Sequence, residues 1–142
     1  MKIDKFTGDY DFLSNFFECD VEYLGLTYRS SEAAYQAAKC KNPNERLAFL
    51  WLTPSTAKRY GKTVEIRPDW DEVKKRIMRD IVYLKFSQWP DLREKLLATG
   101  EAELIEGNTW NDTYWGVCNG VGENNLGKIL MEVRREFRRM GL

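Results

Sequence analysis

Four polar side chains recur at helical spacing within residues 29–41: Glu32, Tyr35, Gln36 and Lys39. Residues three, four and seven positions apart lie on the same side of an α-helix. This face therefore combines a carboxylate, a phenol, an amide and an amine. The pattern is compatible with a solvated helix surface and with a helix that turns its polar groups into a pocket. The segment alone does not distinguish the two.

The helix that carries this face has its own start signals. Ser30 is a suitable N-cap, and Glu32 falls in the first turn, where a carboxylate complements the helix dipole. Four alanines favour the helix and give it a slim body that other elements can approach closely: Ala33, Ala34, Ala37 and Ala38. The spacing therefore predicts a short helix that follows Ser30 and ends before Asn42 and Pro43.

A second unusual segment, residues 108–116, mixes aromatic rings with short polar side chains. Trp110 and Trp115 frame a stretch that includes Asp112. Rings beside hydrogen-bonding groups suit a planar ligand, which stacks on the ring and is hydrogen-bonded at its edge. The alternative is structural, with the tryptophans packed onto the core and the Asn and Asp side chains capping a turn.

The chain contains no histidine, which limits the available chemistry. Ser-His-Asp and Cys-His catalysis are excluded. Cys19, Cys40 and Cys118 lack the spacing of a zinc site, and we expect no metal or cofactor. Acid–base chemistry must then use Asp, Glu, Lys, Tyr or Cys. Few, widely separated cysteines are typical of reduced thiols and indicate a cytoplasmic protein.

Basic residues near glycines could receive a phosphate. Lys62 and Arg67 flank a predicted strand, and Lys128 follows Gly127 at the start of the last predicted helix. A glycine loop that leads into a helix N-terminus can bind a phosphate, and a nearby arginine can bind it through two hydrogen bonds. The loop matches neither a P-loop nor a dinucleotide-binding fingerprint, so ordinary surface solvation is the alternative.

The composition is typical of a soluble globular domain. Hydrophobic residues make up 43% and charged residues 31% of the 142 residues, and this length suits one domain, residues 1–142. Equal numbers of basic and acidic residues give a net charge of zero, which argues against tight binding of long nucleic acid. No apolar stretch reaches the length of a membrane span, so we expect no membrane association.

Periodicity and turn signals predict an α+β domain that is mostly helical, with a small sheet. We expect a first strand and its exit within residues 2–12, a hairpin at 21–28, and strands at 63–67 and 103–106. Besides the helix after Ser30, we expect helices at residues 45–52, 54–60, 70–89, 91–98 and 126–140.

Six short motifs follow one another in the order found in one known family: LSNF at 13–16, SEAAYQAAK at 31–39, Gly61 with RPDW at 67–70, LLAT at 96–99, NDTYWG at 111–116 and NLGKILM at 125–131. They extend over nearly the whole chain, which resembles the NADAR family, also called YbiA-like. Two positions depart from the pattern. Many members have histidine where this chain has Ala33, so that histidine cannot be indispensable, and Val117 stands where relatives often have a polar residue.

The resemblance implies a YbiA-like fold and an N-glycosidase, a hydrolase that cleaves the C–N bond between a ribose and a nitrogenous base or amine. One branch resembles enzymes that hydrolyse phosphoribosylamino-pyrimidine intermediates of riboflavin synthesis. Another is similar to enzymes that remove ADP-ribose from guanine in nucleic acid, and a non-catalytic ADP-ribose-binding module is a further alternative. We expect a small ribosylated, nucleotide-like substrate, with ADP-ribosylated nucleic acid as the alternative partner. The leaving group and the oligomeric state stay open.

Residue chemistry and the resemblance together suggest roles at the site. Cleaving a ribosyl C–N bond develops positive charge at the anomeric carbon, which the carboxylates of Glu32 and Asp112 could stabilise. Lys39 either orients Glu32 through a salt bridge or, as a neutral amine, forms a Schiff base with the ring-opened ribose. Burial would lower the pKa of Lys39 and Glu32 would raise it, and the sequence leaves this balance open. The expected substrate contacts are Asn15, Phe16, Tyr35, Gln36, Arg67, Trp110, Trp115, Gly116, Asn125 and Lys128.

Overall fold

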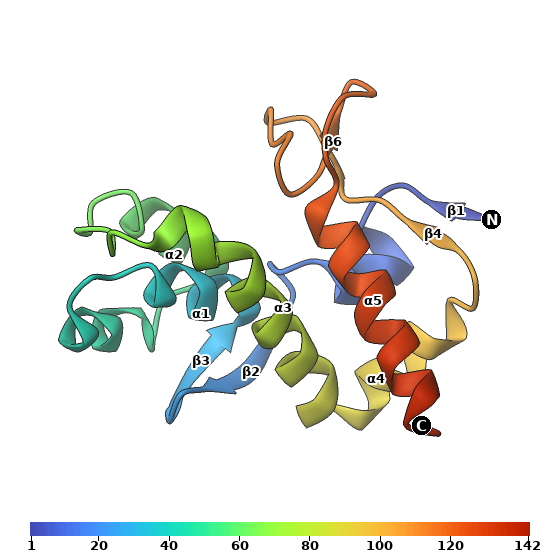
Figure 1. The fold of residues 1–142 in the computed structure, drawn as a ribbon, viewed down its shortest axis with the longest axis horizontal. Helices are drawn as coiled ribbons and strands as arrows, with labels where there is room; N and C mark the ends of the chain where they lie inside the picture. The colour runs from blue at the N-terminus through green and yellow to red at the C-terminus, as the bar shows by residue number, and fades with distance from the viewer. The chain divides into compact units, whose positions relative to one another are not determined.

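The computed structural model describes all of residues 1–142, which form two compact units. Residues 15–88 make one, called here the hairpin unit, and residues 1–14 with 89–142 make the other, the terminal unit. The elements in chain order are β1 (Lys2–Ile3), η1 (Gly8–Leu13), β2 (Glu18–Tyr23), β3 (Leu26–Ser30), α1 (Ser31–Ala38), η2 (Pro43–Phe49), α2 (Pro54–Tyr60), α3 (Trp70–Gln88), α4 (Pro90–Ala98), β4 (Glu103–Leu104), β5 (Gly107–Asn108), β6 (Val117–Cys118) and α5 (Asn125–Arg139) (Figure 1). The fold is α+β and mostly helical, as expected, but the expected small sheet consists of three separate two-stranded ladders. No helix combines the length and the apolar character that crossing a membrane requires.

The hairpin unit is built around α1. All eight residues of this helix are buried, and it packs against β2, β3, η2, α2 and α3 (Figure 1). The alanines make this packing possible. Ala33, Ala34 and Ala37 are 0% exposed, and such small side chains allow several elements to approach the helix at once. Three residues of the polar face, Glu32, Tyr35 and Gln36, are therefore enclosed by protein, which contradicts the interpretation of a solvated surface for them.

Local signals set both ends of α1. The Ser30 Oγ accepts a hydrogen bond from the Ala33 backbone N–H at 3.1 Å, which confirms the predicted N-cap. The Asn15 carbonyl oxygen accepts another from the Glu32 N–H at 3.1 Å, so a second N-terminal donor is satisfied. The helix ends at Ala38 with Lys39 as its C-cap, and it is shorter than the segment 29–41 that carries its sequence signal.

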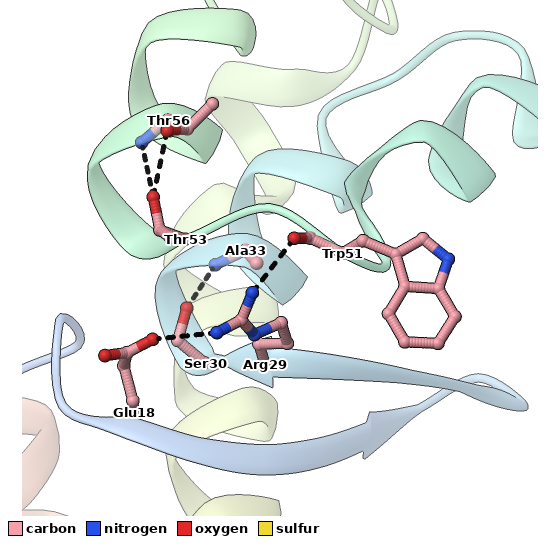
Figure 2. A network of polar contacts seen from close by, with 7 residues as sticks. All are labelled: Glu18, Arg29, Ser30, Ala33, Trp51, Thr53 and Thr56. Atoms are coloured by element: carbon pink, nitrogen blue, oxygen red, sulfur yellow. Dashed lines mark hydrogen bonds and ion pairs between the residues drawn. The ribbon is translucent and has the colours of Figure 1, made fainter.

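Strands β2 and β3 form the expected antiparallel hairpin, and its Arg29 ties it to the chain that follows η2. The guanidinium of Arg29 donates to the Trp51 carbonyl oxygen at 3.2 Å and to the Glu18 carboxylate at 3.4 Å (Figure 2). The indole of Trp51 points away from this network and is 81% exposed. The predicted helices at 54–60 and 70–89 are present as α2 and α3.

Two expectations for this unit were wrong. The segment 45–52 is not a buried helix but lies largely in the 3₁₀-helix η2, in which only Phe49 is buried. Asn42 caps η2 and Pro43 opens it, so the turn begins earlier than the apolar pattern suggested. The strand expected at 63–67 is reduced to one bridge between Ile66 and Cys40, because only a few extended residues separate α1 from η2.

In the terminal unit, α5 packs against α4 and β4. Its apolar residues are buried as the helical spacing predicted: Ile129, Leu130, Val133 and Phe137. Arg134 is also buried, and its guanidinium donates to the Thr99 hydroxyl and the Ala102 carbonyl oxygen, both at 2.8 Å. This arginine therefore fastens α5 to the chain that follows α4.

The strands of this unit are shorter than the sequence suggested. Within residues 2–12 only Lys2 and Ile3 form a strand, and residues 8–13 wind into η1. The strand expected at 103–106 is confined to β4, which pairs in parallel with β1. Strands β5 and β6 also pair in parallel and were not predicted. Two-residue strands contain too little alternation to be recognised in a sequence.

Candidate active site

Glu32 and Gln36 form the centre of the buried polar face on α1. Gln36 follows Glu32 by one turn, and its Nε2 donates a hydrogen bond to Glu32 Oε2 at 2.7 Å. The two residues are only 8% and 7% exposed. A hydrogen bond donated to a carboxylate favours its ionised form. A carboxylate held in this way can stabilise a developing positive charge or activate a water molecule.

Lys39 is half-buried at the end of the same helix. Burial lowers its pKa, and this effect outweighs the nearby Glu32 carboxylate, which acts to raise it. The neighbouring ammonium of Lys62 adds to the lowering. Burial thus decides the balance that the sequence left open. A lysine with a lowered pKa holds a larger fraction of neutral amine, which is the form that attacks a carbonyl or an imine carbon.

Asn15 and Ser31 hold the first turn of α1, on which Glu32 lies. The Ser31 hydroxyl donates to Asn15 Oδ1 at 3.0 Å, and Asn15 Nδ2 donates to the Met78 sulfur at 3.4 Å. The Glu32 N–H donates to the Asn15 carbonyl oxygen. Asn15 therefore fixes the position of the Glu32 backbone. Its expected contact with substrate stays a prediction.

Two predicted aromatic contacts differ in accessibility. The Tyr35 ring lies 5.1 Å from the Trp70 ring, tilted by 48°, and both residues are buried. Phe16 is 41% exposed, and the Lys58 ammonium lies 5.7 Å from the centre of its ring. Tyr35 is thus anchored against α3, whereas Phe16 presents an accessible ring.

The backbones of Arg67 and Lys39 are adjacent, because the Arg67 N–H donates a hydrogen bond to the Lys39 carbonyl oxygen at 3.0 Å. Its guanidinium donates to both carboxylate oxygens of Asp69, at 2.7 and 3.0 Å. These hydrogen bonds raise the pKa of Arg67 and lower the pKa of Asp69. A phosphate bound by Arg67 would have to share the guanidinium with Asp69 or displace it.

In the terminal unit, Asn108 organises the tryptophan-rich loop at residues 108–116. Its Nδ2 donates to the Asp112 carbonyl oxygen at 2.9 Å and to the Glu106 carboxylate at 3.0 Å. Its Oδ1 accepts from the backbone N–H groups of Trp110 and Asp112 at 3.3 and 3.1 Å. One amide thus uses both of its ends to close the loop.

Asp112 contributes to the same loop. Its Oδ1 accepts from the backbone N–H groups of Tyr114 and Trp115 at 3.2 and 2.9 Å, which is the turn-capping role considered as the alternative for this segment. The rings of Tyr114 and Trp115 meet edge to face at 4.8 Å, whereas Trp110 is 57% exposed. Trp110 is therefore the more accessible of the two predicted stacking rings. A catalytic role for Asp112 stays a prediction.

The first residues of α5 bind this loop. Asn125 Nδ2 and the Asn125 N–H both donate to the Tyr114 carbonyl oxygen, at 2.9 and 3.2 Å. The Leu126 N–H donates to the Trp115 carbonyl oxygen at 2.9 Å. These donors of the helix N-terminus are thus already engaged, which leaves fewer for a phosphate than the sequence suggested. Lys128 is exposed in the turn that follows.

Gly116 is required by close packing. A Cβ atom at this position would overlap the Glu106 carboxylate and carbonyl oxygens and would come within 2.7 Å of Asn108 Nδ2. The glycine lets the chain pass directly against these two residues. Its expected contact with substrate stays a prediction.

The predicted site residues divide between the two units. The hairpin unit holds Asn15, Phe16, Glu32, Tyr35, Gln36, Lys39 and Arg67, and the terminal unit holds Trp110, Asp112, Trp115, Gly116, Asn125 and Lys128. From the sequence, Trp70 and Gly61 received no role at the site, although both lie in the motif of residues 61–70. Trp70 contacts Tyr35, and Gly61 lies against Gln36. It also missed Asn108, since nothing in its spacing distinguishes it from an ordinary turn residue.

Comparison with known proteins gives a consistent result. The NADAR domain model matches residues 4–138. N-glycosidase YbiA of Shigella boydii serotype 4 is 39% identical over 135 residues, which cover 92% of this chain and 84% of that protein. A riboflavin biosynthesis protein of Vibrio vulnificus is 36% identical over 135 residues, covering 92% of this chain and 36% of that protein. The NMR structure of the Escherichia coli protein YbiA matches 99% of this chain and 86% of its own, with a TM-score of 0.88 and 34% identity.

These matches confirm the expected YbiA-like α+β fold. The relatives named N-glycosidase cover most of the chain, which makes this protein a hydrolase of the N-glycosidase class. The family-model match extends over residues from both units. The chain belongs to the NADAR domain family.

Proposed function

We propose that this N-glycosidase hydrolyses the C–N bond between a phosphoribose and the exocyclic amine of a pyrimidine intermediate of riboflavin synthesis. The observation that carries the proposal is that α1 holds an enclosed carboxylate, Glu32, and has as its C-cap Lys39, an amine whose pKa burial lowers. The similarity to a relative named for riboflavin biosynthesis supports the choice of leaving group.

Glu32 acts on the ribose in this proposal. When the C–N bond breaks, its electron pair leaves with the nitrogen, and positive charge develops at the anomeric carbon. An ionised carboxylate beside that carbon stabilises the charge, and the hydrogen bond from Gln36 Nε2 at 2.7 Å fixes the direction in which one of its oxygens points. The oxygen of a water molecule forms the new bond to carbon, and one proton of that water goes to the departing amine.

Lys39 offers a covalent route to the same products. A ribose joined to an exocyclic amine can open to an imine, in which the former anomeric carbon is bonded to the leaving nitrogen. The neutral Lys39 amine adds to that carbon and the leaving amine departs, so that a Schiff base to Lys39 replaces the substrate imine. Water then hydrolyses the Schiff base, which releases the ribose as its aldehyde and regenerates the lysine. The lowered pKa of Lys39 supports this route, because the ammonium form cannot attack.

A panel of three substrates tests the proposal: a phosphoribosylamino-pyrimidine, ADP-ribosyl-guanosine and ADP-ribosylated DNA. We expect release of ribose 5-phosphate from the first compound. Turnover of the second or third alone would instead identify ADP-ribose removal as the activity, and turnover of none would refute the proposed substrate class.

Two experiments assign the residues. Substituting Glu32→Gln should lower kcat by about 10²-fold or more, the usual cost of losing one charge-stabilising group, without changing the melting temperature. Glu72→Gln is the matched control, because Glu72 also lies in a first helical turn but is exposed. Borohydride added during turnover should trap a ribosyl adduct on Lys39, detectable by mass spectrometry. Turnover without an adduct would favour direct attack by water.

A further inference from the structure

Gly61 follows α2 directly, and its backbone does not require glycine. Its φ of −61° and ψ of −17° lie in the right-handed helical region, which every L-residue adopts readily. A glycine that ends a helix commonly does so in the left-handed conformation, which explains its use there. That explanation does not apply to Gly61, so the reason for the missing side chain lies elsewhere.

The space that a side chain at position 61 would fill is occupied by Gln36. A Cβ atom on Gly61 would overlap Gln36 Oε1 and would lie 2.8 Å from Gln36 Cδ. The next atom in its way, the Ala57 carbonyl oxygen, would be 3.2 Å away and so only slightly crowded. The conflict is therefore almost entirely with the far end of one flexible side chain. An alanine here should move the Gln36 amide and leave the backbone where it is.

The two ends of the Gln36 amide have different environments. Its Nε2 donates to Glu32 Oε2 at 2.7 Å. Its Oε1 is buried and accepts no hydrogen bond from any protein group, although Gln36 is only 7% exposed. A buried acceptor without a partner is costly and needs an explanation, and a donor on the substrate provides one.

We propose that Gly61 is a positioning residue of the active site: it leaves room for the Gln36 amide to hold Glu32 through Nε2 and to offer Oε1 to a hydrogen-bond donor of the substrate. The inference rests on the proposed role of Glu32. It adds that the substrate carries an O–H or N–H group next to the bond that Glu32 serves. A side chain at position 61 disturbs both ends of the amide together.

The first test measures kinetics with the panel substrate that the wild-type enzyme hydrolyses. Gly61→Ala should lower kcat by about 10-fold to 100-fold, because Glu32 loses its fixed direction. It should also raise KM by about 2-fold to 10-fold, because one hydrogen bond to substrate is lost. The melting temperature should fall by only a few degrees, because the gain from alanine on this backbone offsets part of the cost of the lost Gln36–Glu32 hydrogen bond. Wild-type kcat and KM in Gly61→Ala would overturn the proposal.

A double-mutant cycle identifies Gln36 as the intermediary. Gln36→Ala vacates the space beside Gly61, so adding Gly61→Ala to that variant should change kcat and KM by less than 2-fold. A further 10-fold loss in the double variant would mean that Gly61 acts through another group, and it would overturn the proposal.

The second test needs no substrate. In ¹H–¹⁵N spectra, the Gln36 side-chain NH₂ of the wild type should be protected from exchange with water, because it is buried and bonded to a carboxylate. In Gly61→Ala this protection should fall by at least 10-fold while the backbone signals of α1 keep their positions. Retained protection would refute the inference. If the wild-type enzyme hydrolysed none of the three panel substrates, only the proposed function would be refuted. Failure of the proposed function can therefore be distinguished from failure of the inference about Gly61.

Discussion

The N-cap of α1 offers a sharp test of how burial sets the strength of one hydrogen bond. The Ser30 Oγ accepts from the Ala33 N–H at 3.1 Å, and both residues are 0% exposed. In Ser30→Ala the Ala33 N–H would stay buried without an acceptor, and water could not reach it to replace the lost one. Such a loss costs about 1–3 kcal/mol, and we take about 2 kcal/mol as the central value. For a chain of this size, this corresponds to a fall in melting temperature of about 6 °C.

A second cap in the same unit is the control. The Thr53 Oγ1 accepts from the Thr56 N–H at 3.3 Å, but this bond is exposed (Figure 2). Water can replace the lost acceptor in Thr53→Ala, so the expected cost is about 0.5–1 kcal/mol, or about 2 °C. Both variants remove one side-chain acceptor from a helix start, one buried and one exposed. Thr53→Ala also removes an exposed hydrogen bond from the Thr53 hydroxyl to Thr56 Oγ1 at 2.9 Å, so the comparison is weighted against the expected order.

Thermal unfolding followed by circular dichroism measures both variants in one buffer. Equal losses, or a larger loss in Thr53→Ala, would refute the argument from burial. The kinetics provide a second comparison, because Glu32 lies in the turn that Ser30 caps. We expect kcat to fall several-fold in Ser30→Ala and to be unchanged in Thr53→Ala.

Two further substitutions test the charged groups. Burial lowers the pKa of Lys39, so the unfolded chain binds that proton more tightly than the folded one. Lys39→Met should therefore have a higher free energy of unfolding than the wild type at pH 7, measured by urea unfolding. This difference in stability should shrink as the pH approaches 10.5, the ordinary pKa of lysine. A lower free energy of unfolding at pH 7 would contradict this. Asp112→Asn keeps the Oδ1 that accepts from Tyr114 and Trp115, whereas Asp112→Ala removes it. We expect both variants to lose activity, and only the alanine variant to lose about 1 kcal/mol or more of unfolding free energy. Full activity in Asp112→Asn would refute a catalytic role for Asp112 and leave it only the role of capping the loop.

Local sequence signals predicted the parts of the fold that local chemistry determines. The cap at Ser30, the hairpin around Gly25 and the apolar spacing of α5 each depend on residues close in the chain, and all three are present. The pairing of Glu32 with Gln36 also follows from helical spacing, since a separation of four residues brings their side chains together.

Features that depend on distant residues could not be predicted in this way. The direction of the Lys39 pKa shift depends on how much protein surrounds the end of α1, and that protein comes from other elements. The reason for Gly61 lies in a side chain 25 positions earlier, Gln36. The turn-capping role of Asp112 could not be predicted either, because its two backbone hydrogen bonds form only once the loop has closed.

The absence of histidine explains how the polar face of α1 is arranged. Histidine is the side chain that ordinarily supplies a neutral nitrogen base near pH 7, and without it a nitrogen base requires a lysine whose pKa is lowered by desolvation. Direct pairing with Glu32 would oppose this, because a carboxylate in contact with an ammonium raises its pKa. In α1 the residue one turn from Glu32 is the neutral Gln36, which supplies the hydrogen bond without adding a charge. Lys39 lies about 10 Å along the axis from Glu32, far enough for desolvation to outweigh the attraction. Exchanging the two positions would keep every functional group and place the lysine where the Glu32 carboxylate opposes the lowering of its pKa.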